Sequence, residues 1–470
     1  MSEAAWDLLS HRFNTICCES SPVAAQLCFS VDLFSKSEFL SIQFNEMKNN
    51  NVEKVLMLTL FPHKGNGSST VVRDLGTLMS KKYDIRVFYV GREEADLVDY
   101  QSHFMLVDDF PVLRTHPLSL ERRRFIDLSQ GEITQYLDKL YQEVLQFVSD
   151  FKPDVIHVHH GWLGATVAKR IKEKTGIPFI VQFHGTELEV RSDYHNENSE
   201  TFAFLENLIC EGLENAFSCV AISPTEQTKV SAYLKNANLP PKVLMIPNGY
   251  DENIFYPTEK NFDFVKQKFA SQLKNNPLDE VMPIALFAGR FAGFKGIEYL
   301  VKAARIFGEK NIQTVLCGNG ELYEDMVNLS QDLKVKNIHF LGHVDHYADL
   351  PILYNLADVL LVPSRNEPFG LVAIEAMGCG VPMVASDSGA LPYILDYPEE
   401  EIRDNDCALT PYGIVTPLAD CEAIAKAVLY CIENHFKANN RELIKQYTQN
   451  TFSIATQSSR YECLYAQAVE

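Results

Sequence analysis

The chain has 470 residues, 46% of them hydrophobic, and its 62 acidic and 42 basic side chains give a formal net charge of -20 at pH 7. This size and apolar content suffice for two or three folded domains, and the acidic excess argues against broad electrostatic binding to nucleic acid or anionic lipid. The cysteines form no C-x-x-C pair, as is typical of free thiols in a reducing compartment. No apolar run reaches the roughly 18 to 20 residues of a membrane span, so we expect a cytoplasmic protein without a transmembrane segment.

The first segment, residues 1–51, carries neither a repeat nor a motif, and we expect it to be an N-terminal extension. Between residues 53 and 90 an apolar run, a loop with Gly65 and Gly67, a helical pattern and a second apolar run follow one another. This order is typical of the opening of a Rossmann-type domain. Glycines at such a turn let a ligand approach the backbone, although often they serve only the geometry of the turn.

Two polar clusters allow more than one interpretation, and for both we expect the structural one. His157 and His159 would share one side of a strand and His160 the other, and no metal-ligand spacing surrounds them, so we do not expect a metal site. The three arginines at 122–124 indicate a solvated helix face or loop rather than a patch for an anionic acceptor.

Polar groups also follow two apolar runs that predict parallel strands. The run at 178–183 ends at His184, in the sequence HGTE, and the run at 284–289 is followed by Arg290 and Lys295 in GRFAGFKG. Ligands of open α/β sheets bind at the carboxyl ends of the strands, which is where these side chains would lie. Two cations beside free helix amides suit a diphosphate.

The passage at 358–386, DVLLVPSRNEPFGLVAIEAMGCGVPMVAS, predicts a strand, a loop with Glu367, a helix with Glu375 and a second strand. Phe369, Gly370 and Leu371 open the helix, where unpaired backbone N–H groups and the helix dipole favour an anion such as phosphate. Ionised glutamates repel a phosphate, but they accept hydrogen bonds from sugar hydroxyls. The passage therefore predicts a site for a sugar joined to phosphate.

The run EPFGLVAIEAMGCGVPMVAS resembles the E-x7-E motif of the retaining, nucleotide-sugar-dependent glycosyltransferases of family 4. The loop PHKGNGSST, the HGTE turn, the passage NGYDENIFYP and the last helix are also similar to that family. The resemblance implies an α/β protein of the GT-B fold, in which two Rossmann-like domains face a central cleft. An acceptor-side domain would comprise 52–246, completed by a helix at 452–470, and a nucleotide-sugar domain would comprise 247–451, with NGYDENIFYP as the hinge.

For the site, the resemblance implies that Arg290 and Lys295 stabilise the leaving diphosphate and that Glu375 binds the ribose diol. Glu367 would hold hydroxyls of the donor sugar, and His184 would support that sugar from the other domain. The implied catalytic residues are Glu367, His184, Arg290 and Lys295, and the implied donor-binding residues are Gly65, Gly67, Arg290, Lys295, Phe369, Gly370, Leu371 and Glu375.

The resemblance further implies a retaining transferase that moves a hexosyl unit from a UDP- or GDP-sugar to a glycan, small molecule, lipid or protein. It needs no metal and no cofactor, since the nucleotide sugar is a substrate, and the D-x-D sequence at 404–406 arises readily by chance in an acidic chain. Glu187, Arg191 and Tyr194 are acceptor-side candidates. Tyr393 stands where the family usually has a glutamate.

Two alternatives from other classes stay open. Nucleotide-sugar epimerases with a GT-B-like architecture also bind a nucleoside diphosphate, but they would need acid and base groups at carbon 2 of the sugar. A non-catalytic module that binds nucleotide sugars is the second alternative, against which Glu367, Glu375, Arg290 and Lys295 weigh. An α-glucan synthase would be a subtype of the transferase.

Overall fold

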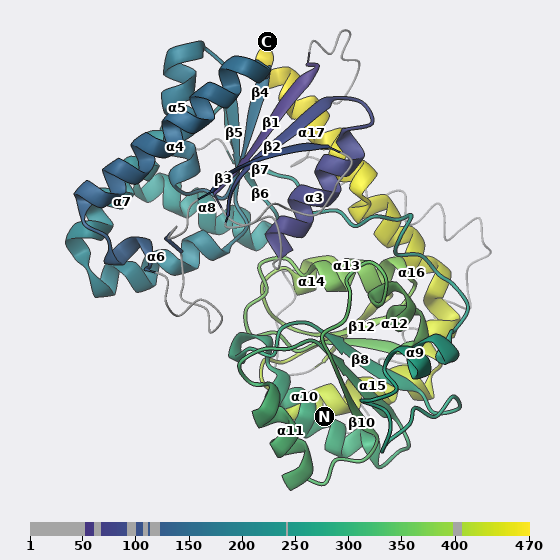
Figure 1. Cartoon of the computed structure of the whole chain (residues 1–470). Coiled ribbons are helices and arrows are strands. Elements are labelled where there is room, and N and C mark those ends of the chain that lie inside the picture. Colours follow the sequence, from purple (N-terminus) through teal and green to yellow (C-terminus); the bar gives the residue numbers. More distant parts are fainter. Residues whose placement is uncertain are drawn as a thin grey trace.

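The computed structural model describes residues 52–60, 67–91, 100–106, 111–112, 123–240, 243–397 and 407–470. The predicted extension, Gly65, Arg122 and the D-x-D sequence lie outside the described residues. The described chain forms two α/β units, one above the other in Figure 1, each built on one sheet. None of its helices combines the length and the apolar character that a membrane crossing requires.

The first sheet has seven strands, all parallel, in the order β3-β2-β1-β4-β5-β6-β7. Leu56 and Leu58 of β1 pack on one of its faces, and Val55 and Met57 pack on the other, so the strand is apolar throughout. The strand order reverses between β1 and β4, and the loops after these two strands therefore diverge around the place where such sheets bind ligands. The strands are β1 (Lys54–Thr59), β2 (Asp84–Gly91), β3 (Gln101–Leu106), β4 (Val155–His159), β5 (Phe179–Gln182), β6 (Ser218–Ala221) and β7 (Val243–Met245).

Helices cover both faces of this sheet. α3 and α17 pack on one face through a shared apolar cluster, whereas α4, α5 and α7 pack on the other. α4 starts at a capping box, in which Ser129 accepts from the amide of Glu132 and the carboxylate of Glu132 accepts from the amide of Ser129. The helices are α3 (Gly67–Met79), α4 (Gln130–Phe151), α5 (Leu163–Thr175), α6 (Thr186–Glu197), α7 (Ser199–Glu214), α8 (Pro224–Asn236) and α17 (Ile454–Val469), with the 3-10 turn η3 (Phe125–Asp127) before α4.

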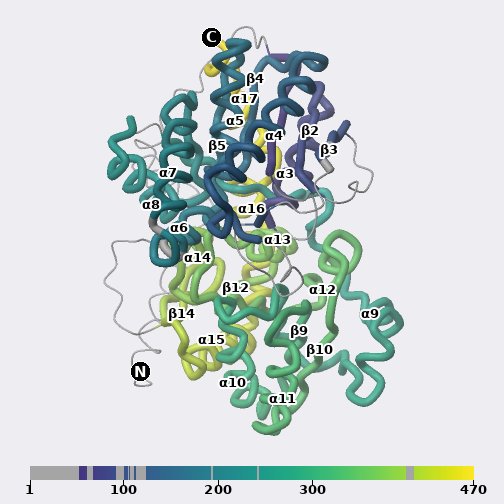
Figure 2. Tube along the Cα trace, turned by 60° about the vertical axis from the view of Figure 1, so that its left-hand side comes forward, coloured from purple at the N-terminus to yellow at the C-terminus, as the bar shows by residue number. Residues whose placement is uncertain are grey.

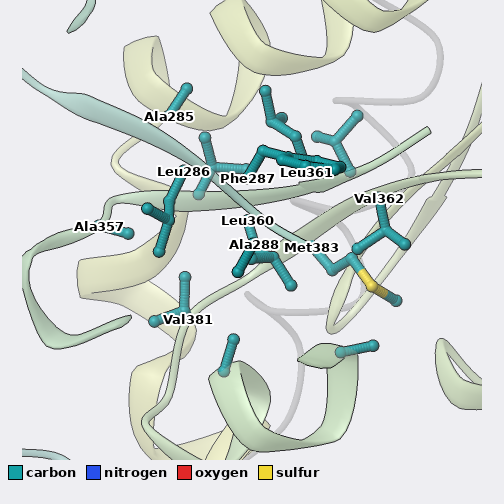
Figure 3. Packing of buried hydrophobic residues seen from close by; sticks show 14 of the residues in the cluster. Ala285, Leu286, Phe287, Ala288, Ala357, Leu360, Leu361, Val362, Val381 and Met383 are labelled. Carbon is teal, nitrogen blue, oxygen red and sulfur yellow. The ribbon is translucent and has the colours of Figure 1, made fainter. Parts of the chain in front are cut away.

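The second sheet has the order β10-β9-β8-β11-β12-β14-β13 and is parallel except for β13. Leu360 of β11 lies beside Leu286 of β8 and Met383 of β12, and these side chains form the centre of the second core (Figure 3). Its order reverses between β8 and β11. The strands are β8 (Ile284–Ala288), β9 (Gln313–Cys317), β10 (Ile338–Gly342), β11 (Val359–Val362), β12 (Met383–Ser386), β13 (Ala408–Thr410) and β14 (Gly413–Thr416).

The helices of the second unit connect these strands. They are α9 (Phe262–Lys268), η4 (Gly293–Lys295), α10 (Ile297–Gly308), α11 (Tyr323–Asp332), α12 (Leu350–Leu356), α13 (Leu371–Gly378), α14 (Leu391–Ile394), α15 (Cys421–Glu433) and α16 (Phe436–Phe452). In Figure 2, α13 and α14 lie at the boundary with the first unit, next to α6 and α3.

The chain crosses between the two units twice, and the two crossings pair with each other. Tyr250 donates its amide to the carbonyl of Phe452 (3.0 Å) and accepts from the amide of Ile454 (2.8 Å). A Cβ at Gly249 would lie 2.6 Å from the Cα of Ile454, so this close approach requires glycine. After the second crossing, α17 packs on the first sheet (Figure 1). The domain boundaries at 246 and 451 stay a prediction.

We expect α17 to be part of the folding unit of the first sheet. Tyr461 is buried on α17, with its ring 4.7 Å from that of His157, so Tyr461→Ala would leave a cavity. The expected loss in the free energy of unfolding is about 3 kcal/mol, measured in urea through the fluorescence of Trp162, which lies in the core of the first unit. The exposed control Ser459→Ala should leave the midpoint unchanged; an equally unchanged midpoint for Tyr461→Ala would show that α17 folds separately.

Candidate functional site

The loop after β8 lies against the loop after β11. A Cβ at Gly296, which has φ +64°, would lie 2.0 Å from the carbonyl oxygen of Pro363, so only glycine allows this contact. The amide of Arg365 donates to the carbonyl of Phe294 over 2.7 Å and ties the loops together. This backbone arrangement brings Lys295 next to the loop with Glu367.

Glu367 is buried, with 6% of its surface exposed, and its charge is balanced by Lys295. Its Oε2 accepts hydrogen bonds from Lys295 Nζ (2.7 Å) and from Ser364 Oγ (2.9 Å). Its carbonyl accepts from the amide of Ala390 over 3.0 Å, which fixes the backbone of the loop. Arg290 is exposed, and no hydrogen bond or ion pair joins its side chain to the described part of the chain.

Gly370 and Leu371 open α13, as predicted. Gly370 has φ +104°, and a Cβ there would come within 3.3 Å of Glu367 and of Leu391, so a side chain would be both strained and crowded. Phe369, the residue before, is buried with its ring 6.1 Å from that of Phe452. Phe369 thus packs into the interior, and Gly370 beside it is also buried.

Glu375 lies one helix turn further on and is 2% exposed. Tyr354 donates to its Oε2 over 3.1 Å, and Nε2 of His346 lies 3.3 Å from its Oε1. Burial raises the pKa of Glu375 to about 8, and the hydrogen bond from Tyr354 offsets only part of this effect. The sequence analysis did not single out Tyr354 or His346; only the position of His346 in the turn after β10, at the carboxyl edge of the sheet, could have indicated it.

On the facing domain, the HGTE turn holds a fully buried carboxylate, Glu187, between β5 and α6. Its Oε1 accepts from the amides of Gly161 (3.1 Å) and His184 (2.8 Å), and its Oε2 lies 3.6 Å from Nδ1 of His160. Burial alone would raise the pKa of Glu187, but its interaction with His160 outweighs burial and lowers the pKa to about 2. Glu187 is therefore ionised at neutral pH.

Four histidines of this domain, His157, His159, His160 and His184, form one buried cluster. His184 Nε2 lies 3.2 Å from His159 Nδ1, and the rings of His184 and His160 are 4.6 Å apart. Burial and the neighbouring His160 hold the pKa of His184 well below its usual value, so His184 is neutral. His157 Nδ1 contacts the hydroxyl of Tyr465 on α17 at 2.7 Å. Within the described ranges, no group of three or more His, Cys, Asp or Glu side chains is placed to hold a metal ion.

The two sides of the site touch each other. A Cβ at Gly185, which has φ +97°, would lie 2.6 Å from the Cβ of Pro368, the residue after Glu367. Ser223 Oγ donates to the carbonyl of Pro368 over 3.0 Å, and Asn366 donates to Glu189. These contacts place His184 and the loop of Glu367 against one another, as the sequence predicts for the two halves of one site.

A second contact joins the start of α3 to α13. A Cβ at Gly67 would lie 3.7 Å from Cδ1 of Leu371, so the first residue of α3 lies close to the start of α13. Further along α3, Asp74 accepts a hydrogen bond over 2.5 Å from Tyr347, which lies between β10 and α12. The first turns of α3 therefore run along the donor-side domain, from Leu371 to the residues next to Glu375.

Several polar residues considered in the sequence analysis have internal partners. Arg191 forms an ion pair with Glu206, and the Tyr194 hydroxyl donates to the carbonyl of Val112 over 3.3 Å. The two described arginines of the triplet are paired within the first domain: Arg123 with Glu132 at 2.6 Å, and Arg124 with Asp127 at 2.8 Å and with Glu197 at 2.6 Å. Their charges are thus neutralised locally, which supports the structural interpretation.

Tyr393, on α14, packs against the end of α16. Its ring is 5.7 Å from that of Phe452, at the end of α16, and burial raises its pKa to about 12. The positive charge of Arg460 on α17 also acts on it, in the opposite direction. The tyrosine therefore supports the joint between the domains.

Two family models match the chain, and together they span both domains. The model described as "Glycosyltransferase Family 4" matches residues 65–253, and the one described as "Glycosyl transferases group 1" matches residues 268–451.

Similar curated proteins include an N-acetyl-alpha-D-glucosaminyl L-malate synthase of Bacillus anthracis, 25% identical over 413 residues, with 87% of this chain and 95% of that protein covered. A D-inositol 3-phosphate glycosyltransferase of Corynebacterium diphtheriae is 29% identical over 279 residues, with 56% of this chain and 62% of that protein covered.

Two solved structures show the same two-domain α/β fold. A sucrose-phosphate synthase of Thermosynechococcus elongatus matches with a TM-score of 0.65 and 23% identity, over 88% of this chain and 98% of that one. HepE of Anabaena, solved in complex with UDP-glucose, matches with a TM-score of 0.59 and 17% identity, over 87% of this chain and 99% of that one.

The raised pKa of Glu375 predicts a pH-dependent cost in stability. The pKa of Glu375 is 4.5 in the unfolded chain and about 8 in the folded protein. Between these two pH values the folded state keeps a proton that the unfolded state has lost, so the free energy of unfolding falls as the pH rises. Glu375→Gln should therefore gain stability over the native protein by up to about 1.4 kcal/mol per pH unit from pH 5 to 8. Thermal unfolding at several pH values measures this gain, and the exposed variant Glu324→Gln corrects for the loss of a charge. If the stability of Glu375→Gln and of the native protein changed in parallel with pH, the raised pKa of Glu375 would be contradicted.

Proposed function

We propose, from the premise that this chain belongs to the family 4 glycosyltransferases, that it moves a hexosyl unit from a UDP- or GDP-sugar to an acceptor with retention of configuration. The α/β GT-B fold and the enzyme class predicted from the sequence are confirmed. One observation carries the proposal: Lys295 pairs with the buried Glu367 at 2.7 Å, and the next residue, Pro368, packs on Gly185 beside His184. A cation, a carboxylate and an imidazole from two domains thus meet at one place.

The cations would bind the diphosphate of the donor. Lys295 is held at the start of the α10 segment by its glycine-bracketed loop, and the exposed Arg290 has freedom to turn toward a ligand. The first turn of α13, which follows Gly370 and has no side-chain cap, would add backbone amides for the diphosphate. As the bond to the sugar breaks, negative charge grows on the diphosphate, and preorganised cations stabilise that charge more than the ground state.

The carboxyl groups would hold hydroxyls. Glu367 accepts from Lys295 and Ser364 through the same oxygen, Oε2, so Oε1 is left for a hydroxyl of the donor sugar. Glu375 would accept from the ribose diol, and this binding favours its ionised form. His184, kept neutral by burial, would offer one ring nitrogen as a donor or acceptor to the sugar without adding a charge beside the diphosphate.

The similar proteins support a nucleotide donor and leave the acceptor open. Anabaena HepE was solved with UDP, with UDP and glucose, and with UDP-glucose, which favours a uridine nucleotide as the first donor to test. The names of two relatives refer to L-malate and to D-inositol 3-phosphate, so small polar acceptors belong beside glycans, lipids and proteins in a screen. We propose that neither a metal nor a cofactor takes part.

A thermal-shift panel of UDP, GDP, ADP, UDP-glucose, UDP-GlcNAc and GDP-mannose tests the proposal. A ligand that binds only the folded state stabilises it, by about 2.7 kcal/mol at 100 times its Kd, and we expect UDP- or GDP-compounds to raise the unfolding midpoint. Absence of a shift with every compound would contradict a nucleotide-sugar site. Labelled UDP-GlcNAc, incubated without an acceptor, separates the classes, because an epimerised sugar would identify an epimerase.

Two substitutions test the residues assigned to the donor. Lys295→Ala removes a cation from the diphosphate, and Glu375→Ala removes the acceptor of the ribose hydroxyls. Each should raise the Kd for the stabilising nucleotide sugar at least about tenfold, since hydrogen bonds to charged groups contribute about 1.5 to 3 kcal/mol. Isothermal calorimetry measures the Kd, with Lys302→Ala and Glu324→Ala as exposed controls of the same domain; an unchanged Kd in both test variants would refute the site.

A further inference from the structure

Three residues far apart in the sequence form a serine-histidine-carboxylate array on the first domain. Ser68 lies in the first turn of α3, His160 directly follows β4, and Glu187 is on α6. Ser68 Oγ is 3.1 Å from His160 Nε2, and Glu187 Oε2 is 3.6 Å from His160 Nδ1. His160 and Glu187 are buried, whereas Ser68 is half-buried. The imidazole therefore stands between a carboxylate in the interior and a hydroxyl near the surface.

The carboxylate of Glu187 faces Nδ1 of His160. Oε1 of Glu187 accepts from the amides of Gly161 and His184, and Oε2 lies 3.6 Å from Nδ1. An ionised carboxylate can only accept, so this arrangement suits the tautomer of His160 that has its proton on Nδ1. Nε2 then has its lone pair toward Ser68, and the hydroxyl of Ser68 donates to it. A hydroxyl that donates to a histidine, which is in turn oriented by a buried carboxylate, is the arrangement of an activated hydroxyl.

The backbone holds His160 in this position at some cost. His160 has φ +73°, a left-handed conformation that is unfavourable for a residue with a Cβ. Its amide donates to the carbonyl of Gln182 (2.8 Å), and its carbonyl accepts from the amide of Trp162 (2.8 Å), so both sides of the strained residue are fixed. With this conformation the His160 ring departs from the alternating directions of the β4 side chains and lies next to Ser68 and His184.

The array also faces the proposed donor site. Gly67, next to Ser68, lies against Leu371 at the start of α13, and Gly185, between His184 and Glu187, lies against Pro368. The ring of His160 is 4.6 Å from that of His184. Ser68 is thus on the acceptor-side domain, bordered on two sides by contacts with the segment that carries Glu367.

We propose that Ser68, His160 and Glu187 form a proton relay that activates the acceptor hydroxyl, an inference that rests on the proposed glycosyl transfer. The acceptor hydroxyl donates a hydrogen bond to Ser68 Oγ. As its oxygen bonds to the anomeric carbon, its proton passes to Ser68 and the proton of Ser68 passes to His160 Nε2. The bond from the anomeric carbon to the diphosphate breaks, and the electron pair stays on the diphosphate. Glu187 stabilises the imidazolium, and the proton returns through Ser68 to a diphosphate oxygen or to water.

Two measurements on the full chain test the relay. In the protein labelled with 15N-histidine, NMR reports which ring nitrogen is protonated, and comparison with His160→Gln identifies the signal of His160. We expect the proton on Nδ1 in the native protein. The second measurement is nucleotide release from UDP-glucose and from GDP-mannose with no acceptor added, so that water takes the place of the acceptor.

In the release assay, Ser68→Ala and His160→Gln should lower kcat about 100-fold, within the usual range of general base catalysis, and change the KM for the donor by less than about threefold. Ser68→Thr keeps the hydroxyl and should retain most of the activity. The exposed variants Ser149→Ala and His195→Gln are matched controls and should behave as the native protein. Ser68→Ala removes one oxygen at a half-buried position, and its thermal midpoint shows that it is folded.

A proton on Nε2 of His160, or a kcat of Ser68→Ala within about threefold of the native value, would overturn the relay. Absence of nucleotide release from both donors by the native protein would count against the proposed transferase instead. The protonation of His160 would still decide whether the relay exists.

Discussion

A carboxylate buried away from water needs a partner for its charge, or it takes up a proton, and Glu187, Glu367 and Glu375 are among the glutamates buried in the described chain. Each is accommodated differently. Glu367 is paired with Lys295 at 2.7 Å, Glu187 is held by two backbone amides and by His160, and Glu375 has only Tyr354 and a histidine, so that burial raises its pKa to about 8. The charge of a bound nucleotide sugar would act on these three groups in different ways, because only Glu367 already has a cation beside it.

The positions of these groups follow from the sheets. In both domains the strand order reverses between two neighbouring strands, β1 and β4 in the first and β8 and β11 in the second. The loops after these four strands carry Ser68, His160, Lys295 and Glu367, so each domain contributes the two loops that diverge at its switch point. Gly185 then allows the turn after β5 to lie directly against Pro368 of the other domain. A side chain at Gly185 would push the two halves apart.

Much of this arrangement could be predicted from local patterns. Apolar runs followed by glycines and charges located the strands and their carboxyl ends, and the approach of Lys295 to Glu367 follows once both loops are placed at the same edge of one sheet. The partners of Glu375 could not be predicted, because Tyr354 looks like an ordinary residue of an apolar helix. The strand alternation separated His160 from His157 and His159, but the left-handed conformation of His160 ends the alternation and brings its ring to His184.

In the proposed reaction each domain would stabilise a different change in charge. The second domain offers cations to a diphosphate that gains negative charge, whereas the first offers neutral imidazoles to a hydroxyl that loses a proton. This division depends on His184 being neutral: a charged imidazole there would repel a proton arriving at His160, 4.6 Å away. In that reaction the ionised Glu187, whose Oε2 lies 3.6 Å from Nδ1 of His160, would stabilise a positive charge on the His160 ring.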